Sequence, residues 1–399
     1  MSAITCFVVQ LLALGAFAAP AVDKTLRFSR DGTFQISVFN DLHYGEAENL
    51  DWGPVQDINT TRVMNEVLDK EFPQLVVLNG DLITGENTYL HNSTHYVDKI
   101  VAPLVQRKLL WASTYGNHDS DFNLSRSGIL AREQRYPYAL TKPMFESKDA
   151  AVSNYYLPVY PYGGKSGYGH EEVPEVILWF FDSRGGNYFQ ETQSNGDEVP
   201  QPNWVDESVA EWFTKTNAQL VSRYRKTIPS LAFYHIPVNA MLAFQNRGVD
   251  PHREPGINDD NPLAQQGLTS GQGDVQGVTF NYTGQDIPFM KAMLGIKGLI
   301  ATFSGHDHGD DWCNKWDSKL PGMDFAGNGL NLCFGRHTGY GGYGTWTRGS
   351  RQVVLDQKLL AKKAVESWVR LEDGTVSGRV TLNATYGTDE YPAVADTFT

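Results

Sequence analysis

The chain has little positive charge to offset its acidic side chains. It contains 33 Lys and Arg residues against 46 Asp and Glu, which gives a formal net charge of −13 at pH 7. Proteins that follow a nucleic-acid backbone present a basic patch or stripe, and the sequence has no apparent stripe of this kind. Long nucleic acid is therefore not an expected partner, and the sequence identifies no partner protein. No internal repeat is apparent either.

Long apolar runs are also scarce. The stretch 4–19 is too short for a confident membrane span, and it ends in Ala16-Phe17-Ala18, which is typical of a signal-peptide cleavage site. We expect residues 1–18 to be a signal peptide that is removed, so that the mature protein is secreted and has no stable membrane span. Because no Lys or Arg precedes the apolar run, retention as an uncleaved anchor is the alternative.

Cysteine is nearly absent, with three residues in 399. Removal of the signal peptide would take Cys6 with it and leave Cys313 and Cys333. An even pair in an oxidising compartment predicts one disulfide, and two buried free thiols are the alternative. Five Asn-x-Ser/Thr sequons agree with the secretory route and predict N-glycosylation. Their acceptors are Asn59, Asn92, Asn123, Asn281 and Asn383.

What the sequence does contain is a set of five short polar clusters, each at the end of an apolar run. In chain order they are Asp41-Leu42-His43, Gly80-Asp81, Gly116-Asn117-His118-Asp119, His235 and Ser304-Gly305-His306-Asp307-His308-Gly309. Short runs of Val, Ile, Leu and Phe predict buried strands, and ligands of a polar centre gather at the carboxyl ends of strands. Imidazole, carboxylate and amide groups without cysteine suit zinc, manganese or iron. The pattern indicates a metal site.

Helical patterns separate the strand-like runs. Residues 59–71 place Val63, Val67 and Leu68 on one face, behind the candidate caps Asn59 and Thr60. The alternation of strands and helices predicts an α/β fold with the metal site at strand ends. Because the five clusters must meet in one place, we expect a single domain over residues 19–399 with a core of about 34–382. The Gly- and Pro-rich stretch 185–202 is expected to be a surface loop.

The order of the five clusters resembles that of the calcineurin-like metallophosphoesterases. Within that superfamily the chain is most similar to the short secreted group that is purple-acid-phosphatase-like. The resemblance covers about residues 34–360 and includes Asn59-Thr60-Thr61-Arg62, Phe233-Tyr234-His235-Ile236-Pro237 and the tail from Asp311-Trp312-Cys313 to Leu332-Cys333-Phe334-Gly335. It implies the metallophosphoesterase fold, in which two mixed β-sheets pack as a sandwich with flanking helices (α/β, or α+β in some schemes).

The resemblance further implies a dinuclear metal centre with one bridging carboxylate. The first metal would be held by Asp41, His43, Asp81 and His308. The second would be held by Asp81, Asn117, His235 and His306. Two divalent or trivalent cations, of Fe, Mn or Zn, can lower the pKa of a bound water and clamp the attacking and leaving oxygens of a displacement.

Four further residues are site candidates, His118 and Asp119 by the same resemblance and the other two by the chemistry of their side chains. His118 matches the family residue that donates a proton to the leaving group, and Asp119 would orient it, with a helix N-cap as the alternative for Asp119. Arg336 and His337 are candidates to meet phosphate oxygens, since Arg matches a phosphate bidentately; a structural turn is the alternative.

The sequence departs from true purple acid phosphatases at one position. Those enzymes carry a Tyr three residues after the Gly-Asp aspartate, whereas Thr84 stands there in Asp81-Leu82-Ile83-Thr84. We therefore expect no tyrosine ligand and a colourless protein.

The function that the resemblance implies is that of a secreted dinuclear-metal phosphoesterase. It would hydrolyse phosphate esters by attack of a metal-bound hydroxide with His118 as proton donor, and a monoesterase of the acid phosphatase type is favoured. Phosphodiester hydrolysis or phosphoprotein dephosphorylation at the same site is an alternative. So is a non-catalytic, metal-binding secreted glycoprotein, although no ligand of the family pattern is missing here.

Overall fold

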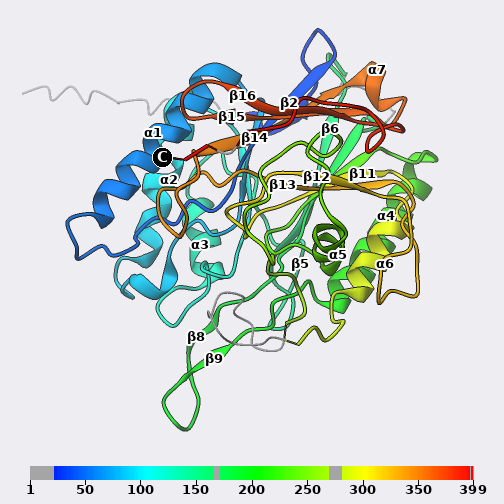
Figure 1. Ribbon diagram of the computed structural model, residues 1–399. Coiled ribbons are helices and arrows are strands. Elements are labelled where there is room, and N and C mark those ends of the chain that lie inside the picture. Colours follow the sequence, from blue (N-terminus) through cyan, green and yellow to red (C-terminus); the bar gives the residue numbers. More distant parts are fainter. Residues whose placement is uncertain (1–21, 165–170, 269–280, 396, 399) are drawn as a thin grey trace, which may run out of the picture.

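Two β-sheets pack face to face between two layers of helices (Figure 1). The computed structural model describes residues 22–164, 171–268, 281–395 and 397–398, so the expected signal peptide lies outside the described residues. Both sheets mix parallel and antiparallel pairs. The predicted sandwich of two mixed sheets with flanking helices is confirmed.

The larger sheet has eight strands in the order β1-β6-β7-β10-β11-β13-β12, with β5 paired to β6. These strands are β1 (Leu26–Arg27), β5 (Phe145–Ser147), β6 (Ala151–Tyr160), β7 (Val176–Phe180), β10 (Ser230–Phe233), β11 (Leu299–Ser304), β12 (Cys313–Trp316) and β13 (Leu330–Phe334). Its centre, β7-β10-β11-β13, is parallel. The carboxyl ends of these four strands therefore meet at one edge.

The smaller sheet has six strands in the order β16-β15-β14-β2-β3-β4. They are β2 (Thr33–Phe39), β3 (Leu75–Asn79), β4 (Trp111–Thr114), β14 (Gly349–Asp356), β15 (Val365–Leu371) and β16 (Val376–Leu382). Here β2, β3 and β4 are parallel, whereas β14, β15 and β16 are antiparallel. Every residue of β3 is buried, which explains why its sequence Leu-Val-Val-Leu is continuously apolar: both faces of the strand are covered.

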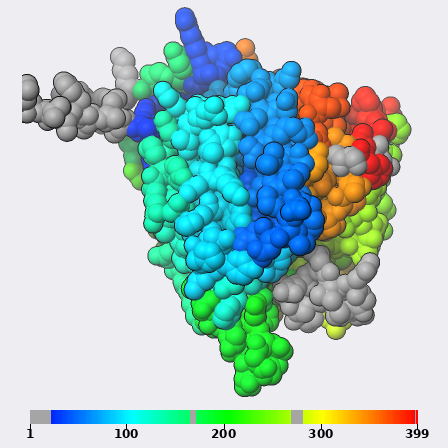
Figure 2. All heavy atoms as spheres, turned by 90° about the vertical axis from the view of Figure 1, so that its left-hand side faces the viewer, coloured from blue at the N-terminus to red at the C-terminus, as the bar shows by residue number. Residues whose placement is uncertain are grey.

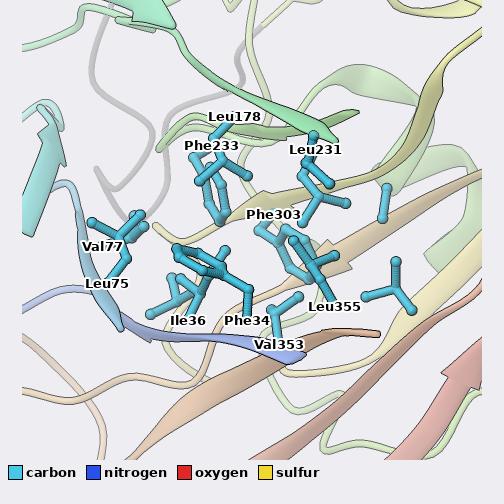
Figure 3. Packing of buried hydrophobic residues seen from close by; sticks show 14 of the residues in the cluster. Phe34, Ile36, Leu75, Val77, Leu178, Leu231, Phe233, Phe303, Val353 and Leu355 are labelled. Carbon is cyan, nitrogen blue, oxygen red and sulfur yellow. The ribbon is translucent and has the colours of Figure 1, made fainter. Parts of the chain in front are cut away.

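The main hydrophobic core lies between the two sheets (Figure 3). Inward residues of the small sheet, such as Phe34, Ile36 and Val77, meet Leu231 and Phe303 of the large sheet. Apolar burial of this kind contributes roughly 25 cal/mol per Å². The sheets are thereby held with their strand ends side by side, and this arrangement places the loops that carry the polar clusters.

Helices cover the outer face of each sheet. Packed on the small sheet are α1 (Gly53–Glu71), α2 (Tyr96–Arg107) and α3 (Arg126–Glu133), and packed on the large sheet are α4 (Glu207–Tyr224), α5 (Asn239–Arg247) and α6 (Ile287–Gly295). A short helix, α7 (Gln357–Leu360), follows β14. In the described part of the chain, no helix combines the length and apolarity that crossing a bilayer requires.

Two local expectations are corrected by the structure. Helix α1 starts at Gly53, with Pro54 in its first turn, so Asn59 and Thr60 lie inside the helix and do not cap it; proline is favoured at this end because its missing N–H is not needed there. The stretch 185–202 is not all loop. It forms the hairpin of β8 (Asn187–Thr192) and β9 (Glu198–Pro200), which projects from the body of the molecule (Figures 1 and 2).

The predicted disulfide joins Cys313 to Cys333. These residues face each other in the antiparallel pair β12 and β13, and both side chains lie in the main core. The pairing anchors the edge strand β12 to β13, and the free-thiol alternative is excluded.

Candidate metal centre

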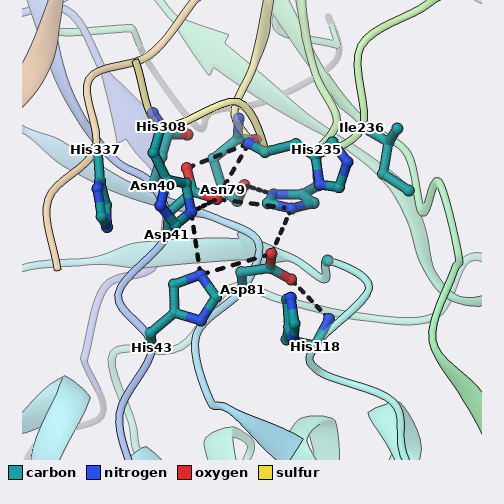
Figure 4. Close-up of polar contacts among 12 residues, drawn as sticks. Asn40, Asp41, His43, Asn79, Asp81, His118, His235, Ile236, His308 and His337 are labelled. Carbon is teal, nitrogen blue, oxygen red and sulfur yellow. Dashed lines mark hydrogen bonds and ion pairs between the residues drawn. The ribbon is translucent and has the colours of Figure 1, made fainter. Parts of the chain in front are cut away.

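The seven ligand candidates follow strands that end at one edge of the sandwich. Figure 4 shows five of them, Asp41, His43, Asp81, His235 and His308, close together there. The small sheet supplies Asp41 and His43 after β2, Asp81 after β3 and Asn117 after β4, and the large sheet supplies His235 after β10 and His306 and His308 after β11. The ligand candidates therefore lie just after strands, as the sequence predicted.

The first group consists of Asp41, His43 and His308. One ligand atom from each lies within 4.8 Å of the others, and all three side chains are buried. The two Nε2 atoms of His43 and His308 are 3.3 Å apart, and Nε2 of His308 is 3.7 Å from Oδ1 of Asp41. Nitrogen lone pairs and a carboxylate that converge in this way fit a single cation.

The second group consists of Asp81, His235 and His306, again with ligand atoms within 4.8 Å of one another. Oδ2 of Asp81 lies 2.9 Å from Nε2 of His235 and 3.8 Å from Nε2 of His43, which belongs to the first group. One oxygen of Asp81 thus lies near a histidine of each group, as a bridging ligand requires. Oδ1 of Asp41 is also close to both groups, at 3.7 Å from Nε2 of His308 and from Nε2 of His235. Each group combines residues from both sheets.

Asn117 supplies an independent test of whether these residues fit a metal. Its side chain is buried, and its Oδ1 has no hydrogen-bond partner among the described residues. A buried amide oxygen without a donor is costly. A cation bound to Oδ1 of Asn117 would satisfy this oxygen, as expected of a ligand.

The histidine rings are held so that Nε2 faces the centre. Nδ1 of His43 is 3.2 Å from Oγ1 of Thr84, and Nδ1 of His235 is 3.0 Å from the carbonyl oxygen of Asn79. Nδ1 of His308 is 2.9 Å from the carbonyl oxygen of Tyr343. Metal-binding histidines commonly use the second nitrogen in this way, which fixes the tautomer. Thr84, at the position of the missing tyrosine, thus supports a ligand.

The backbone of the ligand loops is strained. Asp41, His43, Asp81 and His306 have φ angles of 54°, 48°, 49° and 80°, in the left-handed region that residues with a Cβ rarely adopt. Each such residue costs on the order of 1–2 kcal/mol. Strain at four ligands of one site indicates that the loops are shaped for binding.

The glycine-rich loop after β13 passes directly over the ligands. A Cβ on Gly339 would lie 2.3 Å from the carbonyl oxygen of Leu42, and one on Gly342 would lie 2.5 Å from Cε1 of His308. Only glycine allows the chain to approach this closely. The run 335–344 therefore forms a lining of the centre, a role that sequence reasoning did not assign to its glycines.

His118 lies beside the bridging aspartate and is open to solvent. Its backbone N–H donates to Oδ1 of Asp81 at 2.8 Å, and its ring centroid is 5.0 Å from that of His43. The side chain is 29% exposed, against 3% for His43. Its Nδ1 is 2.8 Å from Oε1 of Glu86, which lies in the 3₁₀ helix η1 (Gly85–Asn87).

Asp119 has a different role from the one expected. Its carboxylate is buried and accepts backbone N–H bonds from Leu82, Ile83 and Gly116 at 2.9–3.0 Å. Burial, together with the charge of Asp81, raises the pKa of Asp119 to about 7. No helix starts here, so the N-cap alternative is also wrong. The carboxylate against His118 is Glu86, which the sequence motifs did not indicate, and Asp119 ties two ligand loops together.

Arg336 and His337 do not face the centre as substrate groups would. Arg336 is buried and forms an ion pair with Asp311, whose Oδ2 is 3.0 Å from Nη1. The His337 ring is buried behind His308, with centroids 3.8 Å apart, and its Nε2 is 3.2 Å from the carbonyl oxygen of Gly341. Neither side chain is placed to contact a phosphate, and both residues take the alternative role, that of a structural turn.

The charges of the site favour cation binding. Burial lowers the pKa of His43 and of His306 to about 3, so both rings are neutral, as ligands must be. Burial would also lower the pKa of His235, but Asp81 outweighs it and raises that pKa to about 9. A cation held by His235 and Asp81 would replace the proton that these two side chains otherwise share.

Two neighbouring, buried ligand groups fit a dinuclear metal centre of the kind that hydrolyses phosphate esters. The family model for calcineurin-like phosphoesterases matches residues 34–310, and the chain belongs to this family. The predicted superfamily is thereby confirmed, and so is the predicted class of enzyme, a metal-dependent phosphoric ester hydrolase.

Relatives of known name agree with the purple-acid-phosphatase-like group. The chain is 26% identical over 392 residues to "Probable inactive purple acid phosphatase 29" of Arabidopsis thaliana, covering 92% of this chain and 89% of the relative. It is 29% identical over 319 residues to "Phosphatase DCR2" of Saccharomyces cerevisiae, covering 78% of this chain and 49% of the relative.

A solved structure shows the same fold. A dimetal phosphatase from Danio rerio superposes with a TM-score of 0.50 at 12% sequence identity, covering 88% of this chain and 98% of that chain.

Proposed function

We propose that this protein is a secreted phosphatase that hydrolyses phosphate monoesters at a dinuclear metal centre. The observation that carries the proposal is the solvent-open His118, which lies beside the bridging Asp81 and is held by Glu86. A structural histidine would be expected to be enclosed like His337. An exposed imidazole next to a metal centre, with its second nitrogen paired to a carboxylate, is suited to proton transfer.

The cations would be held by the seven candidates described above. Asp41, His43 and His308 would hold the first, Asn117, His235 and His306 the second, and Asp81 both. When bound, two cations supply an activated water and neutralise charge on the phosphoryl group. Iron, manganese and zinc all suit these ligands. Because Thr84 supports His43 in place of a tyrosine ligand, we expect a colourless centre.

His118 would deliver a proton to the leaving oxygen. Glu86 accepts the Nδ1–H bond, which leaves Nε2 to face the substrate, and the carboxylate favours the protonated ring. Asp81 fixes the backbone of His118 at 2.8 Å. The donor is therefore placed at a defined position relative to both cation groups.

The complete set of ligands argues against a non-catalytic role. Three relatives from Arabidopsis thaliana carry the word inactive in their names, but this chain keeps all seven ligand candidates together with the His118 and Glu86 pair. Diesters and phosphoproteins remain alternative substrates of the same centre.

Secretion is supported by the disulfide and by the sequons. The Cys313–Cys333 bond needs an oxidising compartment. The five acceptor asparagines, Asn59, Asn92, Asn123, Asn281 and Asn383, all have at least partly exposed side chains. We therefore propose that residues 1–18 direct the chain into the secretory pathway and that 19–399 form one glycosylated domain.

The test combines metal content with turnover on one sample. Elemental mass spectrometry of the purified mature protein should find two metal equivalents per chain, and the same sample should hydrolyse p-nitrophenyl phosphate faster than bis-p-nitrophenyl phosphate. A preference for the diester would make the protein a phosphodiesterase. Two equivalents without turnover on either compound would favour a narrow natural substrate or a binding role, and no metal after reconstitution would overturn the centre.

A further inference from the structure

A second group of charged residues lies at the edge of the sandwich opposite the metal centre. Two adjoining hollows, of about 460 Å³ and about 490 Å³, open where strands β10 and β11 begin. The metal ligands follow the other ends of the same strands. Since β11 has six residues and each advances about 3.3 Å, roughly 20 Å separates the two places.

Five lysines line these hollows. Lys297 and Lys363 belong to both, Lys315 and Lys362 to the first, and Lys226 to the second. The single carboxylate in either lining is Glu175, in the second. In a protein with a net charge of −13, this is a local concentration of positive charge.

Within the described residues, four of the five lysines form no ion pair with a carboxylate. Among the described residues, Lys226 is the one member that forms an ion pair, with Glu175 at 3.9 Å. Lys363 donates to the carbonyl oxygen of Lys297 at 3.3 Å, and Lys315 donates to that of Ala384. These contacts fix side chains at the hollows but add no negative charge. Like charges that line the same hollows repel one another, and a bound anion would offset this repulsion.

We propose that the two hollows bind a small soluble anion with two or more phosphate groups. Each hollow has the volume of a small-molecule site, and the two share a wall that carries Lys297 and Lys363, so that one ligand could place a phosphate in each. Lysine binds phosphate as a point charge. A long polyanion would instead need a basic stripe along an open surface. The site is separate from the metal centre and does not depend on its activity.

The proposal is tested by titrating the metal-loaded, deglycosylated protein with methylenebisphosphonate, which phosphatases do not hydrolyse, in a calorimeter. The glycans are removed because the sequon residue Asn383 lines the first hollow. We expect two binding events, one at the metal centre and one at the hollows. The double variant Lys297→Gln/Lys363→Gln should lose the second event, with affinity reduced at least about tenfold, and should keep the first.

The matched control is Lys70→Gln/Lys215→Gln, which removes two exposed charges from α1 and α4 and should keep both events. Unchanged turnover on p-nitrophenyl phosphate would show that Lys297→Gln/Lys363→Gln is folded. The proposal would be overturned if both events persisted unchanged in Lys297→Gln/Lys363→Gln, or if the native protein showed no event beyond the one at the metal centre. A sulfated oligosaccharide that binds the hollows more tightly than the bisphosphonate would also overturn it, since the ligand would then be an extended polyanion.

Discussion

Oε1 of Glu86 lies 2.8 Å from Nδ1 of His118, across 32 residues of sequence. His118 is anchored by its backbone to Asp81, whereas Glu86 belongs to a separate turn of 3₁₀ helix. The proton donor that we propose is thus assembled from two loops that follow adjacent strands. The orientation of the His118 ring therefore depends on the turn of 3₁₀ helix that carries Glu86.

Replacement of His118 by alanine should separate chemistry from metal binding. The His118 ring is in neither ligand group, so His118→Ala should still hold two metal equivalents while turnover falls by about 10²–10⁴. The loss should be greatest for poor leaving groups, because these need the proton most. Turnover of a series of phenyl phosphates with different leaving-group pKa values measures this, and an unchanged dependence would remove His118 from the acid role.

Glu86→Gln should lower turnover while metal content stays at two equivalents. The neutral amide no longer favours the protonated ring, and we expect a loss of about tenfold or more, again larger for poor leaving groups. Glu48→Gln is the matched control, because its carboxylate, in the neighbouring loop, binds Asn92 and Tyr96. Equal losses in both variants would mean that the effect comes from charge at the rim and not from orientation of His118.

Asp81→Asn should disturb both cations, because its carboxylate lies between the two ligand groups. Asp41→Asn should mainly affect the first cation, since Asp41 belongs to that group. Elemental analysis of both variants after dialysis distinguishes these cases. If Asp81→Asn kept one metal fully bound, the bridging assignment would be wrong.

Gly342→Ala should weaken metal binding beyond the cost of its backbone. The φ angle is 75°, and the new Cβ would lie 2.5 Å from Cε1 of His308 and 3.0 Å from Cδ2 of His43. Gly322→Ala is the control, with φ of 76° and no atom within 4 Å of the new Cβ. Both should lose about 1 kcal/mol or more of unfolding free energy from strain. Reduced metal content is expected in Gly342→Ala alone.

Asp286 should make the fold less stable as pH rises. Burial raises its pKa to about 6, above the unfolded value of about 3.9. Its contribution to stability is therefore fully present below about pH 4 and is lost as pH rises through about 6, by roughly 2–3 kcal/mol. Asp286→Asn keeps an oxygen that accepts the backbone N–H of Asn239, and its amide N–H can donate to the hydroxyl oxygen of Tyr282. Urea unfolding at pH 4 and pH 8 should show a smaller decrease for the variant than for the native protein.

The sequence predicted those parts of the site that depend on strand ends. His235 and Asp81 could be identified because a buried strand is recognisable from its apolar run, and its polar successor must lie at the edge of the sheet. Glu86 could not, because its contact with His118 depends on how a loop turns. Arg336 was misassigned because its partner Asp311 comes from the other side of the β12–β13 hairpin, and no local pattern reveals that burial.

The same distinction holds for the fold. Continuous apolar runs such as β3 predicted buried parallel strands correctly, and the tail cysteines predicted their own pairing. The hairpin of β8 and β9 was missed because its residues are mostly exposed and polar, so that its pairing leaves no apolar alternation in the sequence. The start of α1 at Gly53 was missed because its first turn carries no side-chain cap.

Each ligand group takes its members from both sheets: Asp41 and His43 with His308, and Asp81 with His235 and His306. A cation in either group would therefore cross-link the two sheets, in addition to the core packing and hydrogen bonds such as that from Arg351 to the carbonyl oxygen of Phe334. A chain whose sheets dock in the wrong register cannot present a complete group. Metal uptake would then select the correctly assembled sandwich, and ions bound for the proposed chemistry would also hold the two sheets together.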